Sequence, residues 1–115
     1  MKKLLTALAA MSLITVAAAG NSATQNTKVE MHRYVIERTF PAGALAGLNA
    51  EAKAKVNANN ATAGVRWVES YANADKTKTY CIYEGPSEAA IREASRLNKL
   101  PVDNVMEVPV TLTPK

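Results

Sequence analysis

The side chains best suited to chemistry are a single histidine and the carboxylates near it. Glu30 and His32 stand two residues apart at the start of a β-rich segment, so both project to one side of a strand. An imidazole together with a carboxylate can bind Ni(II), Zn(II) or Cu(II). The chain holds only 1 histidine. The alternative interpretation is therefore that Glu30 and His32 are simply polar residues at the exposed start of a strand.

A second candidate site combines carboxylates with aromatic side chains. Glu37, Glu69 and Glu84 lie among apolar residues in strand-like segments, where a carboxylate is costly unless it is paired. Together with aromatic neighbours, such carboxylates could line a pocket for a small molecule. The residues that we assign to this pocket are Glu37, Trp67, Tyr71, Tyr80 and Glu84. The competing interpretation is that the carboxylates form ion pairs with Arg33, Arg38, Arg66 or Lys78.

The remaining reactive side chain is Cys81, which stands between Tyr80 and Ile82 and is interpreted as a small core residue. With 1 cysteine the chain forms no intramolecular disulfide and no Cys-rich zinc site. The sequence contains no Walker loop and no GxGxxG, GxSxG, HExxH or CxxC motif. Nothing in it therefore commits the protein to catalysis.

The elements that must position these residues follow the order β-α-β-β-α-β. Strands are predicted over 32–40, 65–71, 77–84 and 104–111, with a hairpin turn at 72–76. The first helix follows from the apolar spacing of Leu45, Leu48, Ala52 and Val56, and we expect it to end within 57–60. The second begins at the N-cap Ser87 and buries Ala90, Ile91, Ala94 and Leu97. This order predicts an α+β, ferredoxin-like fold, with two helices on one face of a four-stranded antiparallel sheet.

Large apolar side chains occur on both faces of the predicted strands. On the first strand, Tyr34 and Ile36 alternate with Val35. On the second strand, Trp67, Glu69 and Tyr71 are expected to share one face, opposite Val68. Because two helices can cover only one face, the sequence predicts that a second copy of the chain covers the other, as a sheet-to-sheet homodimer.

The N-terminus has the three parts of a signal peptide in order. A basic start at Lys2 and Lys3 is followed by the apolar segment 4–16 and by the small residues 17–19. We therefore expect a signal peptide over 1–19, a flexible leader over 20–31 and one domain over 32–111. This organisation predicts a periplasmic or secreted protein with no stable membrane anchor after cleavage.

Composition narrows the classes of partner. Of the 115 residues 48% are hydrophobic and 21% charged, which excludes a disordered tail protein and fits one domain. The net charge of +4 falls to +2 once Lys2 and Lys3 are removed. No block of Lys and Arg is longer than two residues, so no nucleic-acid partner is expected.

Several stretches resemble a known family of small proteins. They are Glu37–Pro41, Val65–Trp67, Ser70–Tyr71, Asp75, Lys78–Glu84, Leu100–Pro101 and Glu107–Val108. Together they resemble the domain of unknown function 4242, some of whose members are called nickel-binding proteins. The resemblance covers about 34–108. It implies a ferredoxin-like fold assembled as a homodimer, and it implies nickel binding, with nickel as the possible cofactor, for some members only. No enzymatic activity is established for the family as a whole.

The chain departs from this family just before its Ser-Tyr pair. Glu69 stands where the family commonly has a histidine. If that position holds metal, Glu69 replaces an imidazole with a harder oxygen donor. The metal-site hypothesis therefore rests on His32, Glu30 and Glu69.

Three functions fit these observations. The first is an exported dimeric binding protein for nickel or another divalent transition metal. The second is a cofactor-free enzyme or small-molecule-binding protein that uses a sheet-lined cavity, by analogy of fold. The third is a structural or interaction module.

The signal-peptide prediction fixes the start of the exported protein. Because Ala17, Ala18 and Ala19 offer small residues at the positions that a signal peptidase reads, cleavage after Ala19 should leave Gly20 as the first residue. Intact-mass measurement of the exported protein checks this expectation. Retention of residues 1–19 in a membrane fraction would contradict it.

Overall fold

The computed structural model describes residues 29–115. The expected signal peptide and most of the expected leader lie outside these described residues. The elements are, in chain order, β1 (His32–Thr39), α2 (Ala50–Thr62), β2 (Arg66–Ala72), β3 (Lys78–Gly85), α3 (Glu88–Leu97) and β4 (Asn104–Glu107). Within the described part, no helix is long and apolar enough to cross a membrane.

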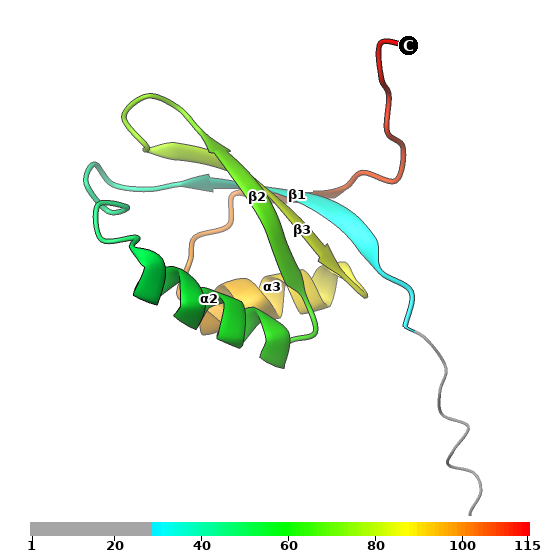
Figure 1. The fold of residues 1–115 in the computed structure, drawn as a ribbon, viewed down its shortest axis with the longest axis horizontal. Coiled ribbons are helices and arrows are strands. Elements are labelled where there is room, and N and C mark those ends of the chain that lie inside the picture. The colour runs from blue at the N-terminus through cyan, green and yellow to red at the C-terminus, as the bar shows by residue number, and fades with distance from the viewer. Residues whose placement is uncertain (1–28) are drawn as a thin grey trace, which may run out of the picture.

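The four strands form one antiparallel sheet in the order β2-β3-β1-β4. Both helices lie on the same side of this sheet (Figure 1). The predicted α+β, ferredoxin-like fold is confirmed. The strand order places β1 and β3 in the centre and β2 and β4 at opposite edges. Candidate site residues on β2 therefore cannot contact those on β4.

The core lies between the sheet and the helices and follows the alternation of β1 and β3. Ile36 stands opposite Cys81 on one side and Val105 on the other, so all three face the helices. Each large apolar side chain buried in this way stabilises the fold by about 1.5–3 kcal/mol. The core comprises Tyr34, Ile36, Val65, Cys81, Tyr83, Ile91, Ala94 and Val105. The expected burial of Cys81 is confirmed.

Helix α3 begins and packs as the sequence predicts. The side chain of Ser87 accepts a hydrogen bond from the backbone N–H of Ala90 at 3.1 Å, which is the expected N-cap. Ile91 and Ala94 are fully buried against the sheet. The helix therefore supplies most of the apolar cover of the sheet centre.

Strand β2 contains a β-bulge that the alternation did not predict. Trp67 pairs with Tyr83 and Glu69 pairs with Ile82, so Val68 is the extra residue. Because Tyr83 and Ile82 point to opposite faces, Trp67 faces the helices whereas Glu69 faces away from them. The prediction that Trp67 shares a face with Glu69 and Tyr71 is wrong for this reason.

Helix α2 starts and ends later than the apolar spacing predicts. Residues 41–49 form turns, in which Ala46 N bonds the Gly43 carbonyl and Leu48 N bonds the Leu45 carbonyl. Gly43 has a φ of 82°, a left-handed conformation that interrupts a helix. The helix begins only after Asn49, whose side chain accepts from Ala52 N at 2.9 Å.

The asparagines near the end of α2 do not terminate it. Asn60 is only 1% exposed, and its Oδ1 accepts a hydrogen bond from Asn98 Nδ2 at 2.9 Å. Asn59 Nδ2 in turn donates to Asn98 Oδ1 at 2.9 Å. Asn98, the C-cap of α3, therefore joins the ends of the two helices. These tertiary bonds outweigh the low helix propensity of asparagine.

Strand β4 is shorter than predicted and ends at Glu107 instead of continuing to 111. Val108 N still donates to the Arg33 carbonyl at 2.8 Å. Pro109 has no N–H with which to extend the ladder. The chain beyond it, red in Figure 1, leaves the sheet on the side away from the helices.

The bridge between the helix ends gives a stability prediction. Asn98→Ala should lower the free energy of unfolding by about 1–3 kcal/mol, because it leaves the buried amide of Asn60 without its bond. Urea unfolding followed by circular dichroism measures the change. Asn57→Ala, at an exposed position of α2, the helix that contains Asn60, is the control and should not lower the free energy of unfolding. Equal stability of the Asn98 variant and the unmodified protein would refute the bridge.

Candidate metal site and interlayer cavity

The end of the sheet brings His32 close to a carboxylate that the sequence did not single out. His32 begins β1, and Glu107 ends the neighbouring edge strand β4. His32 Nδ1 lies 3.1 Å from Glu107 Oε2, and both side chains are partly exposed. Glu30 lines the same hollow, which has a volume of about 360 Å³ and which we call the His32 hollow. Its lining includes Glu30, His32, Arg33, Glu107, Val108 and Thr111.

The donors of the His32 hollow are chemically suited to a borderline metal but are few. An imidazole nitrogen and carboxylate oxygens are ligands that Ni(II) and Zn(II) accept. Among residues 29–115, however, no group of three His, Cys, Asp or Glu side chains is placed to hold a metal ion. Within one subunit the described residues therefore offer only an incomplete set of donors.

Glu69 lies far from this hollow in the sheet. It belongs to β2, the edge strand opposite β4, so the structure brings Glu30 and His32 to one hollow but not Glu69. The Glu69 carboxylate instead accepts a hydrogen bond from the Tyr71 hydroxyl at 2.6 Å. That bond raises the pKa of Tyr71 above its usual value.

The residues assigned to the carboxylate and aromatic pocket are divided between the two faces of the sheet. Glu37, Tyr80 and Glu84 lie on the face without helices, which we call the open face. Tyr71, opposite Tyr80, joins them there. Trp67 lies on the other face, opposite Tyr83. The five residues therefore do not form one pocket within a subunit.

Two carboxylates of the open face, Glu37 and Glu84, are held in ion pairs, as the competing interpretation proposed. Glu37 Oε2 lies 2.7 Å from Lys78 Nζ. Glu84 binds both Arg33 and Arg66. Hydrogen bonds from these two guanidinium groups hold the pKa of the Glu84 carboxyl below its usual value. These contacts leave Glu37 and Glu84 with structural partners.

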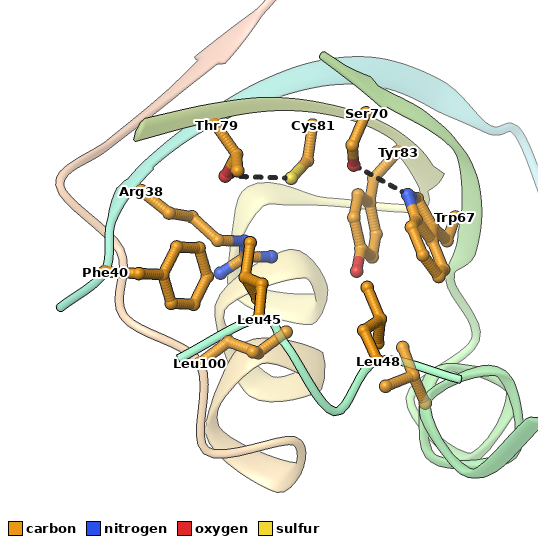
Figure 2. Close-up of a pocket in the computed structure, with 11 residues that line it drawn as sticks. Arg38, Phe40, Leu45, Leu48, Trp67, Ser70, Thr79, Cys81, Tyr83 and Leu100 are labelled. Carbon is orange, nitrogen blue, oxygen red and sulfur yellow. Dashed lines mark hydrogen bonds between the residues drawn. The ribbon is translucent and has the colours of Figure 1, made fainter. Parts of the chain in front are cut away.

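A different pocket lies between the sheet and the helix layer, and we call it the interlayer cavity. It has a volume of about 80 Å³. Its walls come from the helix-facing side of the sheet, from the turns at 41–49 and from α2; Figure 2 shows most of them. The lining residues are Arg38, Phe40, Leu45, Leu48, Val56, Trp67, Ser70, Thr79, Cys81, Tyr83 and Leu100. Apart from Arg38, the walls are neutral.

Arg38 is the residue of this cavity that the sequence reasoning missed. It is 1% exposed, and its Nη1 donates to the Pro101 carbonyl at 2.8 Å and to Ser95 Oγ at 3.1 Å. Its Cζ lies 5.6 Å from the centroid of the Tyr83 ring, within cation–π range. The signal was present in the alternation, because Arg38 stands two residues from both Ile36 and Phe40 and shares their helix-facing side.

Fold and sites together define a small ferredoxin-like α+β domain with a histidine–glutamate pair at one sheet end and a buried cation in its core. A family model described as "Nickel responsive protein SCO4226-like" matches residues 34–108, so the chain belongs to this family. The predicted resemblance is thereby confirmed. No curated protein sequence is significantly similar to the chain.

Among solved structures, the chain is similar to SCO4226 from Streptomyces coelicolor A3(2), a crystal structure. The TM-score is 0.59, at 20% sequence identity. The match covers 70% of this chain and 99% of that chain. At this identity the likeness supports the shared fold.

Proposed function

We propose that this protein is an exported, homodimeric binding protein for a divalent transition metal, with nickel as the leading candidate. The observation that carries the metal proposal is the pair formed by His32 and Glu107 at 3.1 Å, beside Glu30. The description of the family as nickel responsive supports the choice of metal.

The donors of the His32 hollow favour an open site. One imidazole with one or two carboxylates, each binding through a single oxygen, fills two or three of the six positions of an octahedral shell, and water completes the rest. Such a site binds metal more weakly than a closed site of thiolates. Protons compete with the metal for the imidazole, so affinity should fall in acid.

The homodimer is supported by the open face and by the C-terminal segment. On the open face Tyr80 is 45% and Met106 55% exposed, next to half-buried Val35 and Ile82. Beyond β4, Val110 and Leu112 are strongly exposed. A second subunit would bury this apolar surface, and a symmetric pair would contain two copies of His32.

Export is supported by the N-terminal sequence pattern. The basic, apolar and small residues of 1–19 stand in the order of a signal peptide. Cleavage would place residues 20–115 in the periplasm or outside the cell. There the protein would meet metal ions before they enter the cytoplasm.

The metal proposal is tested by titration of chelator-stripped protein with Ni(II), Zn(II) and Cu(II) in a calorimeter. We expect saturable binding that His32→Ala weakens about tenfold or more, because it removes the only imidazole. Glu107→Gln should also weaken binding, since it removes the paired carboxylate.

Two further variants provide controls for this titration. Cys81→Ser changes a buried thiol on the helix-facing side of the sheet and should leave metal affinity unchanged. Glu69→Gln tests whether the position of the family histidine contributes. No heat with any of the three metals, or equal affinity of the His32 variant, would refute metal binding through this hollow.

The homodimer has a separate test. Tyr80→Glu places a charge in the middle of the open face, on the central strand β3, and should convert the dimer to a monomer in sedimentation velocity. Lys53→Glu, at an exposed position of α2, is the control and should remain dimeric. An unmodified protein that sediments as a monomer at micromolar concentration contradicts the proposal.

A further inference from the structure

The open face of the sheet has an apolar middle. The strand register places Ile82 opposite Val35, and Val35 opposite Met106, in one row across β3, β1 and β4. In the next row along the strands, Tyr71 stands opposite Tyr80. Met106 is 55% and Tyr71 57% exposed. The middle of the open face therefore presents large apolar side chains that a partner can bury.

The end of the open face at which β1 begins carries a net positive charge. Arg33 and Arg66 both bind the Glu84 carboxylate there, so two guanidinium groups share one carboxylate. Both arginines remain accessible, because the Arg33 side chain is 47% and the Arg66 side chain 64% exposed. Two further carboxylates at this end, Glu30 and Glu107, line the hollow of the candidate metal site. Their positions alternate with those of the open face, so they do not cancel its charge.

The other half of the open face carries a net negative charge. Lys78 Nζ lies 2.7 Å from Glu37 Oε2 and 3.2 Å from Asp103 Oδ2, so two carboxylates share one ammonium. The Glu69 carboxylate accepts the Tyr71 hydroxyl and forms no salt bridge with any described residue. The open face is therefore bipolar along its strands, with the apolar middle between a positive end and a negative half.

A bipolar face can pack on a second copy of itself in two simple symmetric ways. A two-fold axis that runs across the strands places the positive end of each subunit over the negative half of the other. A two-fold axis parallel to the strands places like charges together, including the two copies of Arg33. Both arrangements bury the apolar middle, so the charges decide between them, and they favour the first.

We propose that two copies of this chain pack open face to open face about a two-fold axis that runs across the strands. The Arg33 end of each subunit then lies over the Glu37 half of the other. This inference rests on the homodimer proposed above and specifies its geometry. Because β1 begins at the positive end, the two copies of His32 lie at opposite ends of the dimer. One metal ion therefore cannot bridge them, and the dimer carries two separate His32 hollows.

Spin-label distances separate the two arrangements. Ala74 is exposed in the turn between β2 and β3, at the end of the sheet opposite to His32. A nitroxide is attached at Ala74→Cys, with Cys81→Ser to remove the native thiol, and double electron–electron resonance measures the distance between subunits. Strand β3 has 8 residues and spans about 27 Å, so the labels of the proposed dimer should lie farther apart than this length.

The arrangement with like ends together gives a different distance. Both turns then lie at the same end of two sheets that pack about 10 Å apart, and the labels come within about 20 Å of each other. A short distance in a dimer overturns the proposed geometry but leaves the homodimer intact. A protein without any distance between subunits, and which sediments as a monomer, overturns both.

The charge pairing is tested by the salt dependence of dimerisation in sedimentation velocity. Raising NaCl from about 0.02 M to about 0.5 M should weaken the dimer about threefold or more, because salt screens the attraction between opposite ends. A dimer with like ends together would instead become tighter, since salt would screen a repulsion. Tighter association at high salt therefore contradicts the proposal.

A charge reversal assigns this effect to the positive end. Arg33→Glu should weaken the dimer about tenfold or more, because it places negative charge over the negative half of the other subunit. Arg92→Glu makes the same change at an exposed position of α3, in the helix layer, and should leave the dimer unchanged. Equal dimerisation of the Arg33 variant and the unmodified protein would overturn the charge pairing.

Discussion

Two helices can cover only one face of a four-stranded sheet, and this constraint determines what each strand residue does. On the helix-facing side, alternation along β1 and β3 buries Ile36, Cys81 and Tyr83. On the open face, the same alternation exposes carboxylates and cations that pair with each other, as Glu84 does with Arg33. The face on which a residue lies therefore decides whether its charge is solvated and paired or enclosed.

Arg38 is the exception to this division of charge. It takes a helix-facing position between two apolar residues of β1, where an aliphatic side chain of similar volume would avoid the cost of a buried ion. The structure compensates part of that cost with the Pro101 carbonyl, Ser95 and the Tyr83 ring. Its Nε and Nη2 stay without a partner among the described residues, so this position costs folding free energy that the rest of the core must offset.

The sequence predicted the element order, the core face of the central strands and the N-cap at Ser87, because each depends on local alternation or on a single side-chain bond. Prediction from the sequence failed where a contact between residues far apart in the chain determines the local structure. The continuation of α2 through Asn60 depends on Asn98 in another helix. The pairing of His32 with Glu107 depends on the register between β1 and β4, which no local pattern specifies.

The bulge in β2 has a consequence for how this chain can change in length. Val68 is the one residue that separates the pairing of Trp67 from that of Glu69. Removal of a residue there would restore a regular ladder in which Trp67 still faces the helices and Glu69 still faces away. Most one-residue deletions in a strand exchange its two faces. At this position a deletion would preserve them, so the strand can vary by one residue without inverting the side chains that follow.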